Sequence, residues 1–153
     1  MRAVVLDASP LGLIAYAKAS PVAADCVRWL TAFLDAGVSI YVPEIADYEV
    51  RRELLRGGLS AGLARLDALI ATSGITYVPL STAAMREAAR LWADARRRGR
   101  PTADPKALDG DAILAAQARL LGFESDEFVV ATSNVGHLGL WVPAEPWATI
   151  RPT

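Results

Sequence analysis

A short apolar run near the start of the chain constrains the fold more than any other feature. Residues 3–6 are all apolar, without polar alternation, and the run stops abruptly at Asp7. Such a run is typical of a strand that is covered on both faces, as in the middle of a parallel sheet. Ligands of open α/β folds bind at the carboxyl ends of the strands, so we expect Asp7 to lie at a binding crevice.

Strand-like and helix-like segments alternate along the rest of the chain. We expect strands also at residues 38–42, 75–80 and 128–132, and a short edge strand at 147–150. Helices are expected at residues 10–18, 21–36, 43–56, 59–72, 81–98 and 109–121. This alternation predicts a three-layer α/β/α sandwich with a central parallel sheet of four to five strands. The irregular Pro-rich linker at 99–107 is too short to divide domains, so residues 1–153 are expected to form a single domain.

Two Ser-Pro pairs predict how the first helices begin. Ser9-Pro10 and Ser20-Pro21 each place an N-cap serine before a proline at the first helical position. Ser81 is expected to cap the helix that follows the third strand.

Composition limits the classes of protein that remain. Hydrophobic residues make up 53% of the chain, so we expect part of its surface to face another chain. No run approaches the roughly 18 apolar residues that span a bilayer, and we expect a cytoplasmic protein with no membrane segment. Cys26 is the only cysteine, which excludes an internal disulfide and predicts a buried thiol. With a net charge of −1, any nucleic-acid binding must use a local patch.

Three acidic residues and one amide stand close to the expected strand ends. Asp7 ends the first strand, Glu49 lies about two turns inside the helix after the second, and Asp111 starts the helix before the fourth. Asn134 follows Ser133 directly after the fourth strand. We hypothesise that these side chains converge. Their oxygen ligands suit Mg²⁺ or Mn²⁺ rather than Zn²⁺, and such a site supports hydrolysis of a phosphodiester.

Each of these residues also has a purely structural interpretation. Asp7 would cap the next helix if Ser9 did not already do so, and Glu49 would pair with Arg52 on an exposed face. Asp109 and Asp111 both lie where a helix dipole favours acids, and Asn134 is a common turn residue. His137 is interpreted as a packing residue or a surface switch rather than a catalytic base.

Four ordered segments of the sequence are similar to those of a known family. They are Val-Val-Leu-Asp-Ala-Ser at 4–9, Tyr-Glu-Val-Arg-Arg-Glu-Leu at 48–54, Asp-Ala-Ile-Leu-Ala-Ala-Gln-Ala at 111–118 and Val-Ala-Thr-Ser-Asn-Val-Gly-His-Leu at 130–138. In this order and spacing the chain resembles PIN-domain ribonucleases, and more narrowly the VapC-type toxins of bacterial toxin–antitoxin pairs.

The resemblance implies a metal site and a reaction. It implies a Mg²⁺- or Mn²⁺-dependent endoribonuclease whose catalytic residues are Asp7, Glu49, Asp111 and Asn134. The first three are the implied metal ligands, with Asn134 and Asp109 as secondary candidates. The family often has Asp where Asn134 stands, so this site carries one charge less. Asp109 is then the N-cap of its helix or an acid that supports the metal ligands.

The resemblance also implies partners. These are an RNA substrate, a small antitoxin protein and a second copy of the chain. The helical hairpin of residues 43–72 is expected to bind the antitoxin and to form the homodimer, with Leu63 and Leu66 on its exposed apolar stripe. An antitoxin arginine is expected to reach the three acids in place of the metal.

Two other functions stay open from the sequence. The first is a PIN-like module with weak or no catalysis that binds RNA or protein, which Asn134 keeps possible. The second is a phosphoacceptor domain of the receiver type, which fits poorly because the first strand carries no acidic pair.

Basic and aromatic residues are a weaker guide to RNA binding. The arginines at 51, 52 and 56 share a helix with Glu49, and those at 96, 97, 98 and 100 precede the linker. Either group could hold an RNA backbone, although basic residues are also favoured at helix ends without any ligand. The four tryptophans are interpreted as core or interface residues rather than base-stacking platforms.

Overall fold

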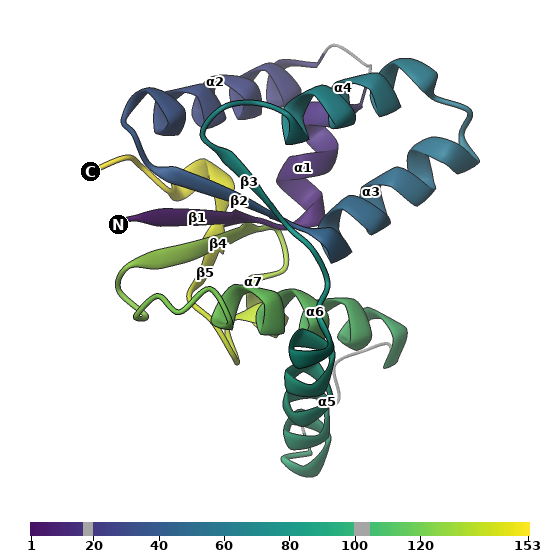
Figure 1. Cartoon of the computed structure of the whole chain (residues 1–153), viewed down its shortest axis with the longest axis vertical. Coiled ribbons are helices and arrows are strands. Elements are labelled where there is room, and N and C mark those ends of the chain that lie inside the picture. Colours follow the sequence, from purple (N-terminus) through teal and green to yellow (C-terminus); the bar gives the residue numbers. More distant parts are fainter. Residues whose placement is uncertain (17–19, 100–104) are drawn as a thin grey trace.

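Five parallel strands form the central sheet of the computed structural model, which describes residues 1–16, 20–99 and 105–153 (Figure 1). The strands are β1 (Ala3–Leu6), β2 (Ser39–Pro43), β3 (Ile75–Val78), β4 (Phe128–Thr132) and β5 (Ala144–Pro146). Their order across the sheet is β3-β2-β1-β4-β5, and every neighbouring pair is parallel. The predicted parallel α/β sheet is confirmed.

The first strand lies at the centre of this sheet. In register, Val4 pairs with Ile40 of β2 on one side and with Val129 of β4 on the other. All four residues of β1 are fully buried, and all five of β4 are buried as well. The apolar run without alternation therefore marks a strand covered on both faces, as predicted.

Helices cover both faces of the sheet. On one face lie α1 (Ala8–Ala15), α2 (Pro21–Asp35), α3 (Glu44–Arg56) and α4 (Ser60–Ile70), and on the other α5 (Thr82–Arg97), α6 (Pro105–Arg119) and α7 (Val135–Leu138) (Figure 1). This is the predicted three-layer α/β/α sandwich. No helix in the described ranges is both long and apolar enough to cross a membrane.

Two predicted N-caps are confirmed by their hydrogen bonds. The Ser20 hydroxyl accepts from the Ala23 N–H at 3.0 Å and begins α2, with Pro21 as its first residue. The Ser81 hydroxyl accepts from the Ala84 N–H at 3.0 Å and begins α5. Cys26 of α2 is fully buried, as expected.

The C-terminal edge strand lies earlier than predicted. Residues 144–146 form β5, whereas Trp147–Thr149 is a short 3₁₀ helix, so the expectation of a strand at 147–150 is wrong. The Trp29 indole N–H donates to the Ile150 carbonyl at 3.1 Å, and the Trp29 and Trp147 rings meet edge to face. These contacts hold the segment against α2 instead of the sheet edge.

The linker before the last long helix is shorter than predicted. Residues 100–104 lie outside the described residues, but α6 already begins at Pro105. Proline suits the first helical turn because its missing N–H would have no partner there. Asp109 is therefore in the second turn, and neither it nor Asp111 begins the helix, which corrects both capping interpretations.

The helical hairpin buries the stripe that was expected to be exposed. Leu66 of α4 is fully buried, and Leu63, Leu69 and Ile70 pack against the core. The prediction of an uncovered stripe through Leu63 and Leu66 is therefore wrong. Short α4 packs its apolar face on α1 and α3, and a turn through Gly58 at φ +64° makes this return possible.

A buried glutamine of α6 is hydrogen-bonded to both α3 and β3. Gln117 of α6 is 2% exposed. Its side-chain oxygen accepts from the Ile45 N–H in the first turn of α3 at 3.2 Å, and its amide donates to the Val78 carbonyl at the end of β3 at 2.8 Å. Gln117 thus fixes α6 relative to α3.

Replacing Gln117 by Leu should lower the stability of the fold. The change keeps much of the side-chain volume but leaves the Ile45 N–H and the Val78 carbonyl without partners, at about 1–3 kcal/mol for each. Urea unfolding followed by circular dichroism would measure this loss. Leu120→Ala, at an exposed residue just after α6, is the control and should change stability by less than about 0.5 kcal/mol. Equal effects of the two variants would contradict the assignment.

Candidate active site

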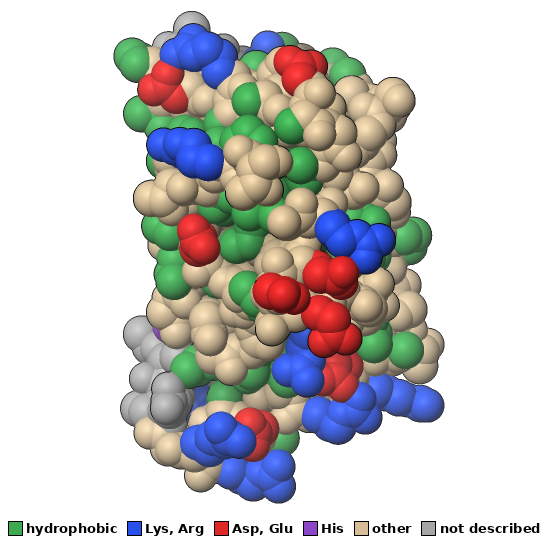
Figure 2. Space-filling view, turned by 90° about the vertical axis from the view of Figure 1, so that its left-hand side faces the viewer, with side chains coloured by type: hydrophobic (Ala, Val, Ile, Leu, Met, Phe, Trp, Pro, Cys, Tyr) green, Lys and Arg blue, Asp and Glu red, His purple; other side chains and the backbone are tan. Residues whose placement is uncertain are grey.

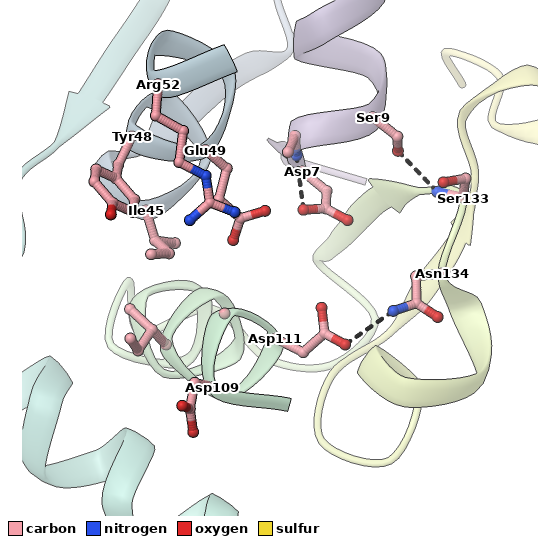
Figure 3. Close-up of a pocket in the computed structure, with 13 residues that line it drawn as sticks. Asp7, Ser9, Ile45, Tyr48, Glu49, Arg52, Asp109, Asp111, Ser133 and Asn134 are labelled. Atoms are coloured by element: carbon pink, nitrogen blue, oxygen red, sulfur yellow. Dashed lines mark hydrogen bonds between the residues drawn. The ribbon is translucent and has the colours of Figure 1, made fainter. Parts of the chain in front are cut away.

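A cavity opens at the carboxyl ends of the central strands. Its volume is about 580 Å³, and β1, α3, α6 and the segment after β4 all contribute to it. All four residues singled out in the sequence line this cavity: Asp7, Glu49, Asp111 and Asn134. Figure 3 shows the three carboxylates reaching into the same space from separate elements.

Asp7 is held in a fixed orientation by two hydrogen bonds. One carboxylate oxygen accepts from the Ala8 N–H at 2.7 Å, which makes Asp7 the N-cap of α1. The other accepts from the Thr132 hydroxyl of β4 at 2.6 Å. Burial raises the pKa of the Asp7 carboxyl, and the two hydrogen bonds oppose this shift.

The predicted cap of α1 was the wrong residue. Ser9 lies inside α1, and its hydroxyl accepts from the Ser133 N–H at 2.9 Å. Ser9 therefore ties the start of α1 to the segment after β4 (Figure 3). Asp7 therefore has the structural role of a helix cap and also faces the cavity.

Asp111 is held by a second, separate group of polar side chains. Its Oδ2 atom lies 2.9 Å from the Asn134 amide nitrogen and 2.9 Å from His137 Nδ1. Burial raises the pKa of Asp111, an effect that the Asp7 charge adds to and that His137 and Asn134 oppose. His137 is therefore a neighbour of the candidate site, a contact that was not predicted from the sequence.

Glu49 is the acid with the most strongly shifted pKa. Burial, followed by the negative charge of Asp7, raises the pKa of Glu49 from 4.5 to about 7. Arg52, one turn further along α3, opposes this shift, and Asp111 adds to it. These couplings show that the three carboxylates interact electrostatically across the cavity.

Asp109 also borders the cavity, but it points elsewhere. Figure 3 shows its carboxylate on the far side of α6 from Asp7 and Glu49. Its side chain is exposed. The structure therefore separates Asp109 from the acids with which Asp111 interacts.

Among the arginines of α3, Arg52 faces the cavity. Its guanidinium stands 5.1 Å from the ring centre of the exposed Tyr48, and both residues line the opening. Arg51 instead bonds to Asp47 and Asp67, and Arg56 bonds to Glu53. Only Arg52 of this group thus remains a candidate for contact with a phosphate beside the acids.

A second group of arginines lies away from this cavity. Figure 2 shows basic side chains gathered at the α5 end of one face, beneath a group of acidic side chains. A hollow of about 670 Å³ is lined there by Arg90, Arg97, Arg98 and Arg119. Arg98 pairs with Asp94, and Arg96 lies over the Trp92 ring. Arg100 lies outside the described residues.

The donor set suits a hard divalent cation, although its side chains are not gathered around one point. In residues 1–16, 20–99 and 109–153, no three Asp, Glu, His or Cys side chains form a group that could hold a metal ion as they stand. Asp111 turns one oxygen towards Asn134 and His137, and the carboxylates repel one another. The carboxylate oxygens, with the Asn134 amide nearby, are still the ligands that Mg²⁺ and Mn²⁺ prefer.

Sequence reasoning missed the residues that support the acids. Thr132, Ser9 and His137 each hold a site residue or the segment that carries one. The signal for Thr132 was its place at the end of β4, the strand that pairs with β1. His137 lies three residues after Asn134, so both share one face of a single helical turn.

The stability of the protein should fall as pH rises through the range in which Glu49 ionises. Its pKa is higher in the folded than in the unfolded chain, so between pH 4.5 and about 7 the folded state binds more protons. Glu49→Gln removes this penalty. We expect about 1 kcal/mol more stability than wild type near pH 8, after solvent screening, and no difference near pH 4.

Thermal unfolding across this pH range would measure the effect, with Glu53→Gln as the control. Glu53 lies on the same helix, and its hydrogen bond from Arg56 lowers its pKa. Its replacement should therefore remove a favourable contribution at neutral pH. A Glu49→Gln variant that is no more stable than wild type at high pH would contradict the electrostatic description.

Comparisons with known proteins agree with this architecture. The sequence profile of the PIN domain matches residues 4–135. A search of curated proteins gave no significant match. Among solved structures, FitAcB from Neisseria gonorrhoeae is similar with a TM-score of 0.66 and 16% identity, over 96% of this chain and 99% of that one.

Two further structures show the same fold. VapBC2 from Rickettsia felis, bound to a DNA fragment from its promoter, gives a TM-score of 0.67 at 13% identity, over 95% of this chain and 98% of that one. DNA-bound VapBC from Salmonella typhimurium gives 0.61 at 19% identity, over 96% and 99%. Because the profile covers residues 4–135, most of the sequence, and the parallel sheet with its helices agrees with this fold, the chain belongs to the PIN domain family.

Proposed function

We propose that the chain is a Mg²⁺- or Mn²⁺-dependent endoribonuclease and the toxin of a VapC-type toxin–antitoxin pair. The observation that carries the proposal is the approach of Asp7, Glu49 and Asp111, from β1, α3 and α6, around one cavity. We treat residues 1–153 as a single PIN-like domain, since β5 and the following segment pack on β4 and α2. Membership of the PIN family supports nuclease chemistry.

Asp7, Glu49 and Asp111 would hold the metal, with Asn134 at the edge of the set. A bound divalent cation supplies Lewis-acid activation of the scissile phosphate and of a water molecule. The protein keeps the Asp7 carboxylate fixed through Ala8 and Thr132. His137 and Asn134 hold one oxygen of Asp111, which leaves the other oxygen for the cavity. Arg52 provides a positive charge for the RNA backbone at the opening.

Removing a carboxylate from the site should abolish most of the RNA cleavage. We expect Asp7→Asn or Asp111→Asn to lower the cleavage rate by about 100-fold or more, because the metal loses charge compensation. Asp109→Asn is the matched control, and its rate should stay within about threefold of wild type because this carboxylate points away from the cavity. Asn134→Asp should keep or raise the rate. Cleavage of a labelled RNA that is equal with and without EDTA would exclude the metal mechanism.

A second function is favoured by one observation. Asn134 stands where the family often has an acid, and it engages Asp111 directly. This favours a PIN-like module that binds RNA or protein with little catalysis. RNA binding without cleavage, in the presence of Mn²⁺, would support this second function over the first.

The proposed partners are an antitoxin and a second copy of the chain. The structural likeness to FitAcB and VapBC, together with the resemblance of the sequence to VapC-type toxins, supports the antitoxin. The helical hairpin exposes Tyr48, Leu55 and Leu59, by 54%, 61% and 37%. These residues, rather than Leu63 and Leu66, are our proposed contact for an amphipathic antitoxin helix and for the dimer. An arginine of the antitoxin would compensate the negative charge of the three acids. We also propose a cytoplasmic location, where the protein would meet its RNA substrate.

Leu55→Glu should weaken both proposed assemblies. Light scattering at micromolar concentration should give a dimer for wild type and a monomer for the variant, because the charge would be buried in the interface. Co-purification with the small protein encoded next to the gene should fall in parallel. Leu120→Glu, at a residue that is 51% exposed and lies beyond α6, is the control and should change neither. A monomeric wild type, with unchanged partner capture by Leu55→Glu, would refute this interface.

A further inference from the structure

A glycine of α6 lies directly beneath the Glu49 carboxylate. Gly110 stands between Asp109 and Asp111 and also lines the cavity. A Cβ atom placed on Gly110 would lie 2.5 Å from Glu49 Oε1 and 3.5 Å from Glu49 Cδ. Real Cβ atoms do not approach another heavy atom as closely as the first of these distances. The carboxylate of α3 therefore occupies the space that any side chain at position 110 would need.

Neither the backbone nor the core explains a glycine at this position. Gly110 is not among the glycines with positive φ, so its conformation is open to any residue. Apart from its chain neighbours and the backbone of its own helix, only Glu49 among the described residues has atoms within 4 Å of the added Cβ. Glycine inside a helix also lowers stability relative to alanine. The contrast is Gly62, whose Cβ would meet the Leu54 side chain and the Ala15 carbonyl and which serves packing.

We propose that Gly110 is a positioning residue that admits the Glu49 carboxylate to the surface of α6 beside Asp111. The inference rests on the proposed metal-dependent function. With a methyl group at position 110, Glu49 would have to turn away, which its flexible side chain can do without disturbing the helix. The fold would survive this change, but the carboxylate would leave the place that it shares with Asp7 and Asp111.

The close approach of Glu49 to Gly110 depends on how α6 is placed against α3. Gln117 fixes α6 against the first turn of α3, and Glu49 is one turn further along the same helix. The spacing of the two helices is thus set by a buried hydrogen bond. The missing side chain at Gly110 then provides the remaining room for an anionic group.

Gly110→Ala separates this role from a structural one. We expect the affinity for Mn²⁺, measured by calorimetry on the full chain, to fall at least about tenfold. Losses of this size are typical when a residue that positions a metal ligand is replaced. The melting temperature should stay unchanged or rise. Gly12→Ala on α1 is the matched control, because its Cβ would meet nothing closer than 3.7 Å. It should leave Mn²⁺ affinity unchanged.

A second measurement tests the close approach without metal. In a Glu49→Ala background the space above Gly110 is empty, so Gly110→Ala should raise the melting temperature more there than in wild type. Equal shifts in both backgrounds, with Mn²⁺ affinity unchanged by Gly110→Ala, would overturn the proposal and leave the nuclease proposal standing. A wild-type chain that neither binds Mn²⁺ nor cleaves RNA would overturn the proposed function and the role of Gly110 in it.

Discussion

Repulsion between carboxylates in a partly buried cavity is the constraint that the rest of the structure has to withstand. Burial raises the pKa values of Asp7, Glu49 and Asp111, and the negative charge of Asp7 raises those of Glu49 and Asp111 further, which means that ionising these acids in the folded state is unfavourable. The fold holds these acids close because each sits on an element anchored elsewhere. β1 is buried between two strands, and α3 and α6 are joined through Gln117.

The three acids are held by different means, and this difference bears on how a cation would be received. Asp7 accepts two hydrogen bonds, and Asp111 accepts one from Asn134 and lies 2.9 Å from His137 Nδ1, so both have a fixed orientation. Glu49 accepts none from the described residues, and its carboxylate occupies the space above Gly110. If these acids bind a cation as proposed, the site would have two fixed ligands and one that adjusts. Mg²⁺ and larger hard cations prefer different ligand distances. An adjustable third carboxylate could meet either distance.

The fold was largely predictable because its signals are local. The apolar runs of β1 and β4 are continuous since helices cover both faces, and the serine caps at Ser20 and Ser81 depend only on adjacent backbone groups. The strand-end rule placed Asp7 at the cavity, whereas the convergence of Glu49 and Asp111 on it was a hypothesis from the sequence that the family resemblance supported. The errors arose where distant contacts decide. Trp29 holds the segment at 147–150 away from the sheet, and α1 begins at Ala8, so Asp7 is its cap while Ser9, inside the helix, accepts from Ser133.

The order of strands also determines when the cavity comes into existence. β1 is the first strand to be synthesised, yet its partner β4 follows more than a hundred residues later, and the bond between Asp7 and Thr132 spans 125 positions. Contacts of such long sequence separation form late, since the intervening chain has to be ordered first. A nascent chain on the ribosome therefore carries Asp7 and Glu49 long before it has an assembled site. The topology thus postpones assembly of the cavity until β4 has been synthesised.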